Sequence, residues 1–357
     1  MSSSRRETKK IHVGSIPVGG DAPISVQSMT NTDTRNVAKT TAQINELAAA
    51  GCEIIRVAVP DDAAAEALSE IIKQISIPLI ADIHFSHRLA LAALKAGVNG
   101  LRINPGNIGG KEKVREVVTA AKDSGVPIRI GVNAGSLEKS IMERHDGVTA
   151  PAMVESALKH IAILEEMNFN NIKVSLKASN IPLMLQAYRQ LAKEVDYPLH
   201  VGVTEAGTVS SGTVKSAVGI GVLLAEGIGD TIRVSLTGDP CHEVKVAYQI
   251  LQALGLRQRG VEIISCPTCG RTEIDLISLA QKVEDKLQGV DKPIKVAVMG
   301  CVVNGPGEAR EADVGVAGGK GVGLIFRKGE IIRKVSENEL LDELMKEIEN
   351  IKSGDRS

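Results

Sequence analysis

From residue 25 onward, two patterns of apolar and polar positions alternate along the chain. Short runs rich in Val and Ile are followed by a polar or glycine-containing loop, and then by a longer segment with an apolar residue every three or four positions. This pattern predicts repeated strand–helix units. The predicted strands are Ser25–Met29, Glu53–Val59, Leu79–His84, Gly100–Asn104, Ile128–Asn133, Ile172–Lys177, Leu199–Thr204 and Thr231–Thr237.

Helical segments such as Val37–Ala50, Ala63–Lys73 and Met153–Met167 separate these strands. Eight units in roughly 250 residues predict a (β/α)8 barrel, the TIM barrel. A doubly wound open sheet is the competing fold, which periodicity alone does not exclude, but the count of eight favours closure. A polar break at residues 255–260 ends the pattern. We therefore predict a barrel domain over residues 1–256 and a small α/β domain over residues 257–357.

The predicted strands carry charged side chains where parallel strands normally read as Val, Ile and Leu. The charges stand at every second position, so within each strand they share one face. The opposite face is apolar and suits contact with the outer helices, so the charged face is predicted to point into the barrel. Its cations are Arg56, Arg102, Arg129, Lys173, Lys177 and Arg233, accompanied by Asp82, His84, Asn104, Asn133, Ser175 and Ser235.

One inward cation in a barrel is ordinarily part of an internal salt bridge, but six on five strands, with few carboxylates, need another partner. Unpaired buried charge is strongly unfavourable, and a polyanionic ligand is the simplest compensation. Arg and Lys grip phosphate oxygens well. The start of the helix after the seventh strand, at Ser210, Ser211 and Gly212, offers further donors where barrels often bind phosphate. We expect a diphosphate or another phosphorylated small molecule.

The second domain contains the motif Cys266-Pro-Thr-Cys269 and, further on, Gly300-Cys301-Val-Val-Asn-Gly-Pro-Gly-Glu308. A Cys-x-x-Cys pair by itself also fits a zinc site or a thioredoxin-like redox pair. Structural zinc prefers four Cys or His ligands, whereas this domain offers three Cys and no His. A cubane cluster has four irons, so three thiolates leave one iron for another ligand. Glu308 is near enough in sequence to supply an oxygen, and we interpret the motifs as an iron–sulfur site.

Composition excludes several other classes of function. Lys and Arg total 42 against 43 Asp and Glu, and the chain has no Trp, three Tyr and three Phe. It therefore lacks both the basic excess and the stacking surface that nucleic-acid binding needs. The N-terminus has no apolar signal core, and no run of about 18 apolar residues occurs. We expect a cytoplasmic protein that binds neither nucleic acid nor membrane. Its odd number of cysteines, five, argues for thiolate chemistry rather than a disulfide framework, with Cys52 and Cys241 as ordinary residues.

The cysteine motifs, together with Arg102-Ile-Asn-Pro-Gly and Arg129-Ile-Gly-Val-Asn133, give the chain a specific resemblance. Over essentially its whole length it resembles the family of bacterial 4-hydroxy-3-methylbut-2-enyl diphosphate synthases. The resemblance implies an oxidoreductase of the non-mevalonate isoprenoid pathway with a 4Fe-4S cluster. Its reaction would be the reductive ring opening and dehydration of 2-C-methyl-D-erythritol 2,4-cyclodiphosphate, with two electrons supplied by flavodoxin or ferredoxin.

The same resemblance implies roles for individual residues. The implied metal ligands are Cys266, Cys269, Cys301 and Glu308, and the implied catalytic residues are Glu205, Asn304 and Glu308. The implied substrate-binding residues are Arg56, Asp82, His84, Arg102, Asn104, Arg129, Asn133, Lys177, Arg233 and Ser235. The inserted domain of the plant-type enzymes is absent, which fits the two-domain bacterial form.

The last predicted barrel helix, near His242–Leu254, leads away from the barrel mouth before the cysteine domain begins. We therefore expect a head-to-tail homodimer in which each cluster faces the partner's barrel, as the resemblance also implies. Two other hypotheses remain open from the sequence. One is a non-redox barrel transferase, similar to dihydropteroate synthase, with a structural metal module. The other is an iron–sulfur sensor whose barrel binds a phosphorylated effector.

Overall fold

The computed structural model describes residues 5–287, 289–301, 307 and 309–351. It divides into two compact units, Met1–Arg257 and Gln258–Ser357, which are considered separately below. Within the described ranges, no helix combines the length and apolar character needed to cross a membrane.

The first unit is a ring of eight parallel strands. The sheet order is β8-β7-β6-β5-β4-β3-β10-β9, and a parallel bridge between Val174 and Leu199 joins β8 to β9. The sheet therefore closes on itself, which confirms the predicted TIM barrel and excludes the open sheet. The strands are β3 (Ser25–Met29), β4 (Ile54–Ala58), β5 (Leu79–Asp82), β6 (Gly100–Ile103), β7 (Ile128–Asn133), β8 (Ile172–Lys177), β9 (His200–Val201) and β10 (Thr231–Ile232).

The last two strands are shorter than predicted. Just beyond β9, a Cβ on Gly202 would lie 2.4 Å from the carbonyl oxygen of Arg233. Because it has no side chain, Gly202 lets the segments after β9 and β10 approach more closely than regular strand pairing allows, and the ladder between these two strands ends there. The residues that follow still carry polar side chains of the barrel mouth.

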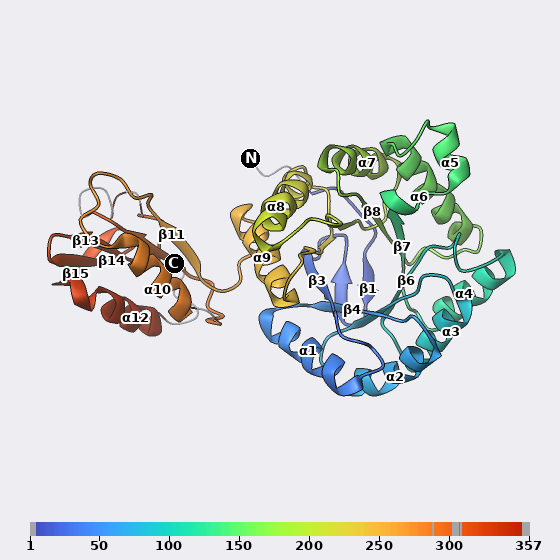
Figure 1. The fold of residues 1–357 in the computed structure, drawn as a ribbon, viewed down its shortest axis with the longest axis horizontal. Helices are drawn as coiled ribbons and strands as arrows, with labels where there is room; N and C mark the ends of the chain where they lie inside the picture. Colours follow the sequence, from blue (N-terminus) through green and yellow to red (C-terminus); the bar gives the residue numbers. More distant parts are fainter. Residues whose placement is uncertain (1–4, 288, 302–306, 308, 352–357) are drawn as a thin grey trace. The chain divides into compact units, whose positions relative to one another are not determined.

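Helices surround the strands (Figure 1), because each presents an apolar face to the outer side of the ring. Asn36, Asp61, Thr149, Asn180 and Asp239 each accept a hydrogen bond from the first turn of a helix, which fixes where that helix begins. The helices are α1 (Val37–Ala50), α2 (Asp62–Lys73), α3 (His87–Ala96), α4 (Lys111–Asp123), α5 (Lys139–Arg144), α6 (Ala150–Glu165), α7 (Ile181–Glu194), α8 (Val209–Ala225) and α9 (Pro240–Ala253), with a 3-10 turn η1 (Ala134–Ser136).

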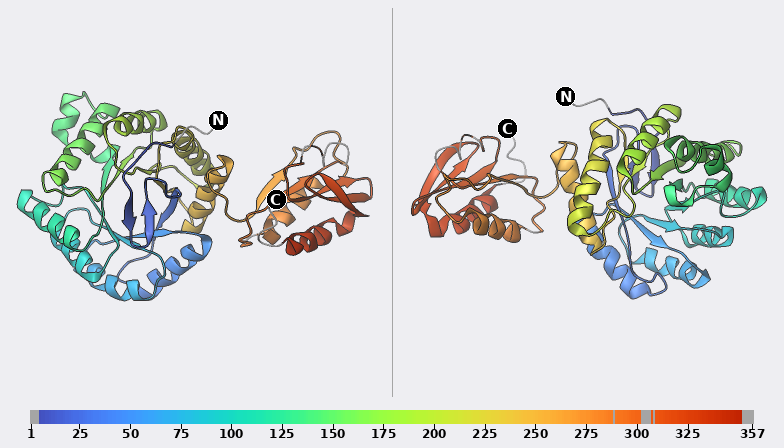
Figure 2. Two further views of the ribbon diagram at one scale, coloured as in Figure 1. Left: turned by 180° about the vertical axis from the view of Figure 1, so that it is seen from behind. Right: turned by 45° about the horizontal axis from the view of Figure 1, so that its top comes forward.

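A short antiparallel hairpin, β1 (Ile11–Val13) and β2 (Ile16–Val18), precedes the barrel and was not predicted. Its apolar side chains pack with Ile54 and Ile80, which stand near the amino ends of their strands. The hairpin therefore covers the end of the barrel opposite the mouth, and Figure 2 (left) shows it across the centre of the ring. Strands of three residues are too short to produce a readable alternation.

The second unit is a mixed five-stranded sheet in the order β11-β12-β13-β14-β15. The pairs β11–β12 and β12–β13 are parallel, and the remaining pairs are antiparallel. Apolar side chains of the sheet and of both helices form its core. The elements are β11 (Glu262–Ser265), α10 (Leu276–Leu287), β12 (Lys295–Met299), β13 (Val314–Gly319), β14 (Val322–Arg327), β15 (Glu330–Ser336), η2 (Glu337–Glu339) and α12 (Leu340–Asn350).

Candidate active site

Asp82, at the end of β5, is the centre of a charged network inside the barrel. Its Oδ1 lies 3.2 Å from Nη1 of Arg102, and its Oδ2 lies 3.6 Å from Nε of Arg56. His84 Nε2 lies 3.6 Å from Oδ1 of Asp82 and 3.3 Å from Arg102 Nη1. Burial alone would raise the pKa of Asp82, but Arg56, His84 and Arg102 hold that pKa well below its usual range. The carboxylate is therefore ionised and orients both guanidinium groups.

Glycine makes the Arg102 position possible. A Cβ on Gly131 of β7 would lie 2.5 Å from Nε of Arg102, and Nη2 of Arg102 donates to the Gly131 carbonyl at 3.3 Å. The neighbouring strand thus leaves the space that the guanidinium fills. A similar relation holds at the adjacent strand pair of the ring, where a Cβ on Gly202, just beyond β9, would lie 2.9 Å from Nζ of Lys177 on β8.

Arg129 and Lys177 are buried cations that the carboxylates of the barrel do not neutralise. Arg129 is 2 % exposed, and its Nε and Nη1 have no hydrogen-bond partner among the described residues. Burial, together with the charges of Arg56 and Arg102, lowers the pKa of Arg129 well below its ordinary value. Burial also lowers the pKa of Lys177, and Arg233 and Arg129 add to that shift. These unfavourable charges are the electrostatic signature of an anion site.

The structure adds two side chains that the sequence analysis missed. The Met29 sulfur, on β3, accepts from Arg56 at 2.9 and 3.2 Å and from Arg233 at 3.8 Å. Glu243, in the first turn of α9, lies 3.5 Å from Nη2 of Arg233 and accepts from Ser28 and from the Leu236 amide. Met29 continues the period-two inward face of β3, which was a readable signal. Glu243 reaches the ring from a helix, so strand alternation gave no sign of it.

The remaining barrel residues of the predicted set stand around the mouth, after or near the ends of strands. Asn104 is buried and its side chain accepts from the Gly106 amide at 3.2 Å, while Asn133 pairs in register with Lys177. Glu205 is exposed and has a left-handed backbone, with φ of 52°, which is uncommon for a residue with a side chain. Ser235 is partly buried just beyond β10. No contact between Glu205 and the arginine network is present.

The cysteine loops meet because β11 and β12 are parallel neighbours, with Ser265 opposite Val298. Cys266 directly follows β11, and Cys301 follows β12 after a single glycine. The Gly300 amide donates to the Cys266 sulfur at 3.2 Å, and the Glu273 amide donates to the Gly300 carbonyl at 3.0 Å. The Arg271 amide lowers the pKa of the Cys269 thiol. Both loops are thus fastened after the carboxyl ends of β11 and β12, and the Arg271 amide favours the thiolate form of Cys269.

The spacing of the three sulfurs can be compared with that around a single zinc ion. Zinc–sulfur bonds of 2.3 Å in a tetrahedron place sulfurs about 3.8 Å apart. Among the described residues, only Glu46, Asp239 and Cys241 form a group of three or more such ligand atoms within 4.8 Å of one another. The three sulfurs of the cysteine loops therefore do not all lie within 4.8 Å of one another, a wider spacing than that around a single tetrahedral zinc ion.

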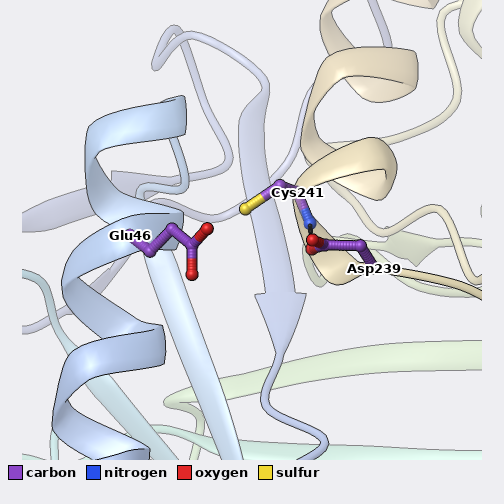
Figure 3. A group of neighbouring side chains, drawn as sticks. All are labelled: Glu46, Asp239 and Cys241. Atoms are coloured by element: carbon purple, nitrogen blue, oxygen red, sulfur yellow. Dashed lines mark hydrogen bonds between the residues drawn. The ribbon is translucent and has the colours of Figure 1, made fainter.

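The group of Glu46, Asp239 and Cys241 lies outside the barrel (Figure 3). Asp239 accepts from the Cys241 amide at 2.8 Å and so caps α9, while Glu46 projects from α1. Burial raises the pKa of the Cys241 thiol to about 11 and that of Cys52 to about 12, so both keep their protons near neutral pH. Asn304 and Glu308, named above for catalysis and metal ligation, lie outside the described residues.

Family models match both units of the chain. A model described as the GcpE TIM-barrel domain matches residues 8–248, and a model described as the GcpE protein C-terminal domain matches residues 262–350. The chain belongs to the GcpE family. Relatives from Geobacter sulfurreducens and Clostridium acetobutylicum are each 63% identical over 347 residues, which is 97% of this chain and 98% and 99% of theirs. Both are named 4-hydroxy-3-methylbut-2-en-1-yl diphosphate synthase (flavodoxin), which confirms the predicted resemblance.

Solved structures of other proteins share the barrel fold alone. Dihydropteroate synthase from Stenotrophomonas maltophilia matches with a TM-score of 0.52 at 14% identity, covering 70% of this chain and 98% of that one. The Yersinia pestis enzyme matches with a TM-score of 0.50 at 13% identity, covering 69% and 97%. At sequence identity this low, the matches support a shared barrel fold and say nothing about function.

Proposed function

We propose that this chain is a flavodoxin-dependent 4-hydroxy-3-methylbut-2-en-1-yl diphosphate synthase, which reductively opens and dehydrates 2-C-methyl-D-erythritol 2,4-cyclodiphosphate in the non-mevalonate pathway. Membership of the GcpE family and 63% identity to synthases over nearly the whole chain support this function. Within the structure, the main support for this function is the set of buried cations in the barrel, whose positive charge exceeds the negative charge of the neighbouring carboxylates. Such a set demands a strongly anionic substrate, as a cyclic diphosphate is.

The barrel residues would bind and orient the diphosphate. Arg129 and Lys177 have charge that the protein leaves uncompensated, so they would take phosphate oxygens most strongly. Arg56 on β4 and Arg102 on β6 are already oriented by Asp82 and would present further donors. His84, Asn104, Asn133, Arg233 and Ser235 would complete the contacts around the mouth. Preorganised donors of this kind cost little reorganisation when the substrate binds.

Cys266, Cys269 and Cys301 would hold a 4Fe-4S cluster, with Glu308 as the fourth ligand. When bound, such a cluster supplies the electrons for the reduction. The Arg271 amide favours the thiolate form of Cys269 that this ligation requires. Glu205, held in a strained backbone at the mouth, would move a proton at the departing oxygen, with Asn304 assisting.

Turnover of the cyclodiphosphate by anaerobically purified protein with reduced flavodoxin tests the function directly. We expect iron and sulfide in the purified protein, and formation of the linear hydroxylated diphosphate. Glu205→Gln should keep the cluster's absorption spectrum and lose most turnover. Zinc in place of iron would point to a transferase, and cluster-containing protein that binds but never converts the substrate would point to a sensor.

The catalytic unit is proposed to be a head-to-tail homodimer. α9 runs back from the mouth over 14 residues, a length of about 20 Å. Arg257 then binds Glu53 at 2.7 and 3.0 Å and the Ile24 carbonyl at 2.8 Å, just before the amino ends of β4 and β3. Arg257 is the last residue of the barrel unit, and these contacts anchor it at the end of the barrel opposite the mouth, which supports use of the partner's barrel.

Mixing subunits tests this assembly. Arg129→Ala disables the barrel and Cys301→Ser disables the cluster site, so neither variant should turn over alone. After random exchange, half of the dimers are mixed and each has one intact site, so activity should recover to about one quarter of the wild type. Verified mixed dimers without any recovery would contradict the shared site, while leaving the proposed reaction of each wild-type site untouched.

A further inference from the structure

The inner end of the barrel contains an arc of polar side chains that no described residue satisfies. Each member is at most 2 % exposed, and each has a side-chain nitrogen or oxygen without a hydrogen-bond partner within the described part of the chain. Protein interiors rarely leave so many polar atoms together without a guest. The members of this inner polar arc are Arg129 on β7, Lys173 on β8, His200 on β9, Thr231 on β10, and Ser25 and Gln27 on β3.

The arc is continuous along one side of the ring. Arg129 pairs in register with Lys173, the bridge between Val174 and Leu199 joins β8 to β9, His200 pairs with Thr231, and Thr231 pairs with Ser25. The neighbouring residues Val174, Val201 and Ile232 face the outer helices, so alternation turns the arc inward. On the other side, Ile54 and Ile80 pack against the hairpin and close the floor with apolar groups.

Charge makes the arc an anion site. Lys173 is 1 % exposed, and burial together with Arg129 and Arg56 lowers its pKa to about 7. Asp230 is the carboxylate that acts on Lys173, but its oxygens already accept from Arg5 at 2.7 Å, Thr8 at 3.1 Å and the Leu199 amide at 2.7 Å. The arc therefore contains two cations and several neutral donors without a free carboxylate.

We propose that the inner polar arc binds one small monovalent anion of the halide class between Lys173 and Arg129. Hydroxyl, amide and imidazole groups of the other members supply neutral donors to it. A small ion suits this place because every member of the arc is at most 2 % exposed, whereas a diphosphate needs the open mouth. The site lies beneath the proposed substrate position and shares Arg129 with it, but it does not depend on the proposed reaction.

Diffraction tests the proposal most directly. Crystals of the full-length protein grown in sodium bromide should give an anomalous peak within bonding distance of Lys173 Nζ, in protein with or without substrate. Ordered water alone at that position, with no anomalous signal, would overturn the proposal and assign a neutral amine to Lys173.

Stability measurements give an independent test. At equal ionic strength, the barrel should melt at least about 2 °C higher in sodium chloride than in sodium gluconate. Lys173→Met, which keeps the length of the side chain and removes its charge, should lose this difference, whereas Lys95→Met, on an exposed position of α3, should keep it. An equal halide effect in all three proteins would overturn the proposal. If Lys173→Met fails to fold, the bromide experiment on the wild type still decides.

Discussion

Asp82→Asn tests whether the barrel is built around uncompensated positive charge. The substitution keeps the shape of the side chain and removes the one carboxylate between Arg56, Arg102 and His84. Because the Asp82 side chain is only 6% exposed, loss of its charge should destabilise the barrel by about 3–5 kcal/mol, the usual cost of breaking a buried ion pair. The same change makes the site more positive, so inorganic pyrophosphate should bind the variant more tightly and restore more of its stability than it adds to the wild type.

Urea unfolding followed by tyrosine fluorescence is the suitable assay. The chain has no Trp, and Tyr188, Tyr197 and Tyr248 all lie in the barrel unit, so the signal reports that unit alone. A matched control is Asp196→Asn, which removes an exposed ion pair with Lys9 and should cost less than about 1 kcal/mol. Equal stability of Asp82→Asn and wild type, with equal stabilisation by pyrophosphate, would refute the electrostatic reasoning.

The difference in stability between wild type and Asp82→Asn should depend on pH, because the pKa of Asp82 is depressed in the folded state. The unfolded chain then binds the proton more readily, so stability from this group is fully present above the ordinary Asp pKa of about 3.9 and is lost as pH falls below it. The difference in unfolding free energy between wild type and Asp82→Asn should therefore be constant from about pH 5 upward and should become smaller in more acidic solution.

Three further predictions concern other contacts. Gly131→Ala should displace the Arg102 side chain and raise the KM for the cyclodiphosphate by about tenfold or more, without changing the cluster spectrum. The control is Gly135→Ala, whose added methyl group meets open space and should leave this KM unchanged. A Cβ on Gly300 would lie 3.0 Å from the side chains below it, so Gly300→Ala should lower the iron content per chain. Arg257→Ala should cost the barrel about 1–3 kcal/mol in urea unfolding, and wild-type stability would show that this anchor is not formed in solution.

Much of the fold was readable from the sequence because its signals are local. Eight Val- and Ile-rich runs, each followed by an amphipathic segment, set the barrel, and β3, β7 and β8 have their predicted bounds. The hairpin β1–β2 was missed because strands of three residues carry no clear period. β9 and β10 were predicted too long because the close approach at Gly202 is a contact between distant segments, which no local pattern reveals.

Within the candidate site, period-two alternation identified the inward cations, and the cysteine motifs pointed to the two loops that the structure brings together after β11 and β12. Alternation gives the face of a strand but not its partners across the ring. The sulfur of Met29 between Arg56 and Arg233, and Glu243 reaching in from α9, depend on how the strands and helices close around one another. For the same reason, the sequence could count six inward cations but could not tell which of them have carboxylate partners. Closure of the barrel decided that Arg102 is paired with Asp82, while Lys173 Nζ and two Arg129 nitrogens have no hydrogen-bond partner among the described residues. Only the folded ring brings such distant side chains within a few ångströms of one another.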